Sequence, residues 1–129
     1  EPGPVPTGEA LLELGTTNQT KLSGAPVRGP LFEFAPAIDQ FLKTHLFGDI
    51  FARDNLDWRS RELATVAALA SLPGVESQLL AHVRISVNVG LRTEQLEQFA
   101  GALSDQGHAD AAGRVRSAIE RYRRDSGKR

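Results

Sequence analysis

Apolar residues at helical spacing constrain the fold of this chain more than any other feature. The clearest run covers residues 57–72, where the apolar side chains recur every three or four positions and form one stripe: Leu63, Val66, Ala67 and Ala70. Asp57 is a good N-cap for this helix, and Pro73-Gly74 is a strong stop signal. The run therefore predicts a helix from about residue 58 to residue 72.

The same spacing predicts further helices on both sides of this run: residues 36–53 with an interruption at Gly48, then 75–89, 94–103 and 109–124. Pro36 suits a first helical turn, Gly90 is placed to end the third helix in a left-handed conformation, and Thr93 is expected to cap the fourth. No segment predicts a strand, and no internal repeat is present. The fold class expected is all-α.

The ends of the chain differ in composition from its middle. Residues 1–30 hold five of the seven prolines and predict an extended Pro/Gly-rich arm, with a short helical turn at residues 8–14. Residues 31–124 form the expected helical domain, and residues 125–129 a basic tail. Because the sequence does not begin with methionine, we expect a processed or trimmed chain. A removed leader would make it periplasmic; otherwise the cytoplasm is favoured, and localisation stays open.

The composition and net charge of the chain limit the classes of function that it can have. Hydrophobic residues at 40% and charged residues at 24% are globular values, and no stretch approaches the roughly 20 apolar residues of a membrane span. The net charge of −1 argues against a nucleic-acid partner, although residues 114–129 are basic. We therefore expect neither a nucleic-acid nor a membrane partner.

The chain has no cysteine, which excludes disulfides, thiolate zinc sites and a cysteine nucleophile. The three histidines, His45, His82 and His108, show no metal-ligand spacing on one helix, so no metal is expected. No glycine-rich phosphate loop or Ser/His/Asp motif is recognisable either. The sequence predicts no cofactor.

Four segments in this order and spacing carry a resemblance to a known family: residues 56–72, 78–82, 88–91 and 93–96. Together they resemble the carboxymuconolactone decarboxylase family of the alkylhydroperoxidase D-like superfamily. The resemblance implies an oligomeric helical bundle and either decarboxylation or thiol-dependent peroxide reduction. The peroxidase branch needs a Cys-x-x-Cys pair ahead of its histidine, and the corresponding positions here are Val75 and Gln78. The chain therefore resembles a cysteine-less member, in which peroxidase activity is not expected.

His82 is the candidate catalytic residue, because an imidazole can give or take a proton near neutral pH and the resemblance places it at the family site. Glu62, on the preceding helix, could orient it. Alternatively, His82 is a structural histidine and Glu62 makes a surface pair with Arg59 or Arg61. The candidates for substrate binding are Arg61, favoured over Arg59 and Arg84, together with Gln78 and Ser86 near His82.

These residues lead to two hypotheses of function. The first is a lyase that acts on a small carboxylated or lactone substrate, with His82 as the proton donor. The alternative is a non-catalytic homo-oligomeric module that binds a small molecule or serves as a scaffold. Whether the chain is an enzyme stays open. Residues 63–72 are apolar on most sides, which predicts a homo-oligomer, as a dimer, trimer or hexamer.

Overall fold

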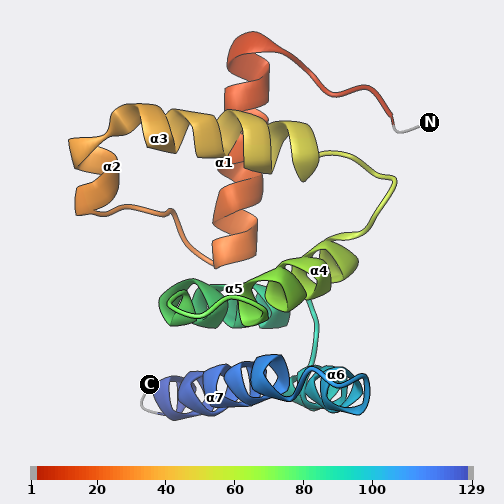
Figure 1. Ribbon diagram of the computed structural model, residues 1–129. Helices are drawn as coiled ribbons and strands as arrows, with labels where there is room; N and C mark the ends of the chain where they lie inside the picture. Colours follow the sequence, from red (N-terminus) through yellow and green to blue (C-terminus); the bar gives the residue numbers. More distant parts are fainter. Residues whose placement is uncertain (1–2, 128–129) are drawn as a thin grey trace. The chain divides into compact units, whose positions relative to one another are not determined.

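The computed structural model describes residues 3–127, which form helices joined by loops and contain no strand (Figure 1). This confirms the all-α fold class. The elements in chain order are α1 (Gly8–Ser23), α2 (Pro30–Phe34), α3 (Pro36–Phe41), η1 (Leu42–Ile50), α4 (Trp58–Ala70), α5 (Glu76–Asn88), α6 (Thr93–Asp105) and α7 (Ala109–Ser126). The chain divides into two compact units, Glu1–Trp58 and Arg59–Arg129. None of the described helices is long and apolar enough to cross a membrane.

The first unit is built on α1, which packs against η1. Residues 8–23, part of the segment expected as an extended arm, are thus helical over sixteen residues. The physical reason is tertiary packing, which overrides the weak local signal. Leu22 is fully buried, and Asn18 Nδ2 donates a hydrogen bond to the Phe47 carbonyl oxygen (2.8 Å). Gly15 allows the approach, since a Cβ there would lie 1.7 Å from the Lys43 carbonyl oxygen.

The helix expected over residues 36–53 begins at Pro36 but changes its geometry along its length. After α3 the backbone continues as a π-helix, η1, from Leu42 to Ile50. Gly48 lies inside η1 and does not interrupt it. This glycine is buried against α1, where a Cβ would come within 2.7 Å of the Leu11 side chain. The glycine therefore allows close packing, and the interruption expected at this position does not occur.

The second unit contains α4 to α7, in which both α5 and α6 pack against α7. Its buried core draws on all four helices: Val66, Ala70, Leu79, Val83, Leu91, Leu96, Ala100, Ala111, Ala112, Val115, Ala118 and Ile119. Two residues of the expected α4 stripe, Val66 and Ala70, are fully buried. Hydrogen bonds also join α4 to its neighbours. Among them, Arg59 donates to the Val89 carbonyl oxygen at the end of α5, and Arg114 of α7 donates to the Ala70 carbonyl oxygen (2.8 Å).

The helix ends in the second unit follow the sequence signals with one exception. Gly74 and Gly90 adopt positive φ values of 82° and 102°, as expected for residues that terminate helices. The cap predicted at Thr93 is wrong. Thr93 is the first helical residue, and Arg92 occupies the N-cap position, where its backbone N–H donates to Gln95 Oε1 (2.9 Å). The Gln95 side chain, which accepts from the backbone N–H of Arg92, thus takes part in the cap in place of the expected Thr93 hydroxyl.

Candidate functional site

His82 and Glu62 lie in contact on neighbouring helices of the second unit. The Nδ1 atom of His82, on α5, lies 2.8 Å from Oε2 of Glu62, on α4. The Glu62 side chain is completely buried, whereas 23% of the His82 side chain is exposed. Because a carboxylate oxygen accepts, Nδ1 carries the hydrogen of this bond. With Glu62 as the acceptor, the neutral His82 ring is the Nδ1–H tautomer, in which Nε2 carries no hydrogen.

Local helix geometry explains why the two side chains meet. Glu62 precedes Val66 and Ala70 at a spacing of four, so it lies on the same buried line of α4. His82 adjoins Val83, a buried core residue of α5. A carboxylate therefore occupies a position where the pattern of α4 would accommodate an apolar residue. The expected alternative, in which Glu62 pairs with an arginine on the surface, is wrong.

Glu62 has a second oxygen, Oε1, which is buried without a hydrogen-bond partner among the described residues. A buried carboxylate with one unsatisfied oxygen is costly, and most buried polar groups in proteins are satisfied. Replacement by an apolar side chain would avoid this cost. The burial of this half-satisfied carboxylate is thus poorly explained by stability alone.

The other candidate residues are placed differently. Ser86 is fully buried, and its hydroxyl donates to the His82 carbonyl oxygen (2.7 Å) within the same helix. Gln78, one turn before His82, is exposed and its Oε1 accepts a hydrogen bond from Ser77 (2.9 Å). Arg61 is half-buried on α4 beside Glu62 in the sequence. A role in substrate binding for these three residues stays a prediction.

The two remaining arginine candidates hold structural positions. Arg59 Nε donates to the Val89 carbonyl oxygen at the end of α5 (3.1 Å), and its guanidinium lies where Gly90 has no side chain. Arg84 pairs with Asp125 of α7. The contact between Arg59 and Gly90 was not predicted from the sequence. Gly90 was interpreted only as the residue that ends a helix, although a glycine also permits another side chain to approach closely.

Four surface pockets and the possible metal ligands of the described residues do not add to the site around His82. Four surface pockets are lined by other residues and include neither His82 nor Glu62. Within residues 3–127, no group of three His, Asp or Glu side chains could hold a metal ion. A pocket beside His82 at a subunit boundary concerns the assembled protein and stays a prediction.

A comparison with family models decides the relationship. Residues 36–120 match the model of the carboxymuconolactone decarboxylase family. The chain belongs to this family. The match extends from α3 into α7 and includes both Glu62 and His82. It confirms the resemblance found in the sequence, and the absence of cysteine makes this a cysteine-less carboxymuconolactone decarboxylase family member. No curated protein matches the sequence.

Proposed function

We propose that this carboxymuconolactone decarboxylase family protein is a lyase that acts on a small carboxylated or lactone substrate, with His82 as its proton donor. One observation carries the proposal: the partly exposed His82 ring is oriented by a buried carboxylate, Glu62, at 2.8 Å. A histidine whose Nδ1 is held by a carboxylate can present Nε2 to a bound molecule in a fixed direction.

The proposed reaction is a decarboxylation. The bond between the substrate carbon and its carboxylate breaks, CO₂ leaves, and the electron pair stays on the carbon, delocalised into the adjacent unsaturated lactone. Nε2 of the His82 imidazolium gives its proton to that carbon, and water reprotonates the ring. Glu62 accepts from Nδ1–H throughout and holds the orientation of the ring. Glu62 is a positioning residue, because it acts through His82.

The experiment compares CO₂ release from carboxymuconolactone and related lactone acids by the wild type, His82→Ala and His82→Gln. Loss of a general acid lowers kcat by roughly 10²- to 10⁴-fold, and we expect both variants to fall in that range. His108→Ala is the matched control, since His108 is exposed and precedes α7. Equal rates from the wild type and both His82 variants would eliminate the mechanism.

The partner expected for this protein is a second copy of itself. Several large apolar side chains of the single chain are exposed: Leu31, Phe34, Ile38 and Phe41 on α2 and α3, and Leu72 after α4. On α4 itself, Ala64 and Ala68 are also exposed. Exposed apolar surface of this kind is typical of interaction surfaces, and it supports a homo-oligomer.

The alternative function, a non-catalytic homo-oligomeric scaffold or small-molecule-binding module, is favoured by one observation. None of the four pockets includes His82. If His82 only joins α4 to α5, its replacement lowers stability and no tested lactone acid is consumed by the wild type. Turnover by the wild type that is lost in His82→Gln, with an unchanged melting temperature, would contradict this alternative.

A further inference from the structure

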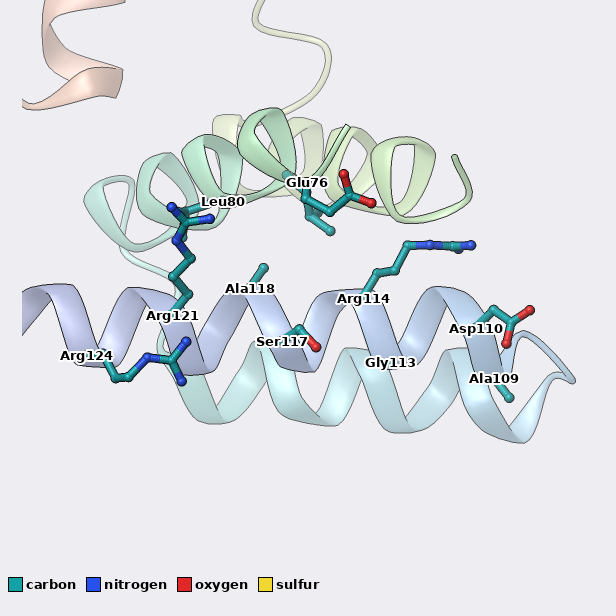
Figure 2. Close-up of a pocket in the computed structure, with 11 residues that line it drawn as sticks. Glu76, Leu80, Ala109, Asp110, Gly113, Arg114, Ser117, Ala118, Arg121 and Arg124 are labelled. Atoms are coloured by element: carbon teal, nitrogen blue, oxygen red, sulfur yellow. The ribbon is translucent and has the colours of Figure 1, made fainter. Parts of the chain in front are cut away.

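A groove in the second unit lies between α5 and α7, with a volume of about 560 Å³ (Figure 2). This volume is within the range of pockets that bind small molecules, about 300–1,000 Å³. Its apolar lining includes Leu79 and Leu80 from α5 and Ala118 from α7, all of which are buried. Gly113 widens the groove, because the space that its Cβ would occupy contains no atom within 4 Å.

Two arginines give one end of the groove its charge. Figure 2 shows Arg121 reaching from α7 toward Leu80, while Arg124 lies one turn further along the same helix. Within residues 3–127, neither guanidinium has a hydrogen-bond or ion-pair partner, in contrast to Arg84 and Arg123, which pair with carboxylates. Two unpaired cations beside an apolar surface provide an anchor for an anion.

The other end of the groove cannot serve the same purpose. There Arg114 donates to the Ala70 carbonyl oxygen (2.8 Å), and Glu76 and Asp110 also line the groove. Negative charge on a ligand is therefore opposed at that end and attracted at the end of Arg121 and Arg124. The groove combines an apolar surface with a single basic end.

We propose that this groove is a second binding site, which takes a small carboxylate with an apolar body. The carboxylate lies between Arg121 and Arg124, and the body lies along Ala118 toward Gly113. Ala118 and Gly113 are five positions apart on α7, which corresponds to about 7.5 Å along the helix axis. This length accommodates a chain of about six to eight carbons. The site is independent of the proposed lyase activity, because neither His82 nor Glu62 lines it.

The first part of the test measures binding to the full chain by isothermal titration calorimetry with three probes. Octanoate has both the charge and the apolar body, octan-1-ol has only the body, and acetate has only the charge. We expect octanoate to bind at least tenfold more tightly than either of the others. The absence of octanoate binding, or equal affinity for octan-1-ol, overturns the proposal.

The second part uses matched variants. Arg121→Gln with Arg124→Gln is expected to weaken octanoate binding at least tenfold, whereas Arg92→Gln with Arg116→Gln removes the same charge outside the groove and is expected to change it less than twofold. Gly113→Leu fills the groove and is expected to abolish binding, while Gly101→Leu, a helical glycine outside the groove, is not. The proposal is overturned if the two arginine double variants lose octanoate affinity to the same extent. It is likewise overturned if Gly113→Leu and Gly101→Leu lose the same affinity.

A final variant separates this site from the proposed lyase site. His82→Ala is expected to bind octanoate with the affinity of the wild type, whatever its effect on lactone acids. A tenfold loss of octanoate affinity in His82→Ala would show that the probe binds at His82 and would overturn the assignment to the groove. Failure of the lyase assay, by contrast, leaves the expected octanoate results unchanged.

Discussion

The guanidinium of Arg59 fills the space that the absent side chain of Gly90 leaves open. Arg59 Nε donates to the Val89 carbonyl oxygen (3.1 Å), and a Cβ on Gly90 would lie 2.9 Å from Arg59 Nη2. Gly90 also has a φ of 102°, which side-chain-bearing residues rarely adopt. The start of α4 and the end of α5 are thus joined at a position where only glycine fits.

Gly90→Ala is therefore expected to destabilise the protein. The strained backbone at a positive φ costs about 1–3 kcal/mol, and the end of the Arg59 side chain must also shift to make room for the Cβ. Urea unfolding measures the change. Gly113→Ala is the control, because it lies inside α7 with open space around its Cβ and is expected to stabilise by about 0.5–1 kcal/mol. Equal stability of Gly90→Ala and the wild type would contradict the left-handed backbone conformation of Gly90.

The contact between Glu62 and His82 predicts a spectroscopic signature. In the wild type, the neutral His82 ring carries its hydrogen on Nδ1, because Glu62 Oε2 accepts there. In Glu62→Leu this acceptor is absent, and the ring is expected to shift to the Nε2–H tautomer. The ¹⁵N chemical shifts of the two ring nitrogens distinguish the tautomers. Glu62→Gln retains an acceptor oxygen and is expected to retain Nδ1–H; the same tautomer in all three proteins would argue against a positioning role.

Gly15 makes a comparable prediction for the first unit. A Cβ at this position would lie 1.7 Å from the Lys43 carbonyl oxygen, so Gly15→Ala must separate α1 from η1. The cost is expected to exceed about 2 kcal/mol, although alanine is the better helix former. Hydrogen exchange of the α1 amides is expected to accelerate. Unchanged exchange in α1 would mean that the two helices do not pack closely.

The sequence predicted those features that depend on local spacing. The stripe of α4, with Val66 and Ala70 buried, and the termination of α5 before Gly90 follow from helical periodicity and glycine conformation. The proximity of Glu62 to His82 could be hypothesised, since Glu62 shares the spacing of four with Val66. Burial could not be deduced, because a carboxylate near a helix start is equally typical of an exposed pair.

Features that depend on packing between distant segments were not predictable. The length of α1 is set by its contacts with η1, and the π-helix at Leu42–Ile50 has no recognisable sequence signal. The groove between α5 and α7 likewise requires Arg121 and Leu80, residues 41 positions apart, to lie on facing helices. Only the three-dimensional structure brings these groups together.

Glu76 predicts a pH dependence of stability. Its carboxylate accepts hydrogen bonds from its own backbone N–H and from the N–H of Gly74, and these bonds, with a smaller contribution from Arg114, hold the pKa of Glu76 below its ordinary value of 4.5. A carboxyl whose pKa is lowered by folding contributes stability above its unfolded pKa. This contribution disappears as the pH falls through the lower, folded pKa.

Glu76→Gln is therefore expected to be less stable than the wild type at pH 6 and to approach it in stability below pH 4. The measurement is the free energy of unfolding in urea at pH values from 3 to 7. Glu120→Gln on α7 is the control, since the Glu120 carboxylate accepts no hydrogen bond from the described backbone, and its difference from the wild type is expected to vary less with pH. A difference for Glu76→Gln that stays constant from pH 3 to pH 7 would show that its carboxylate is not held by these backbone groups.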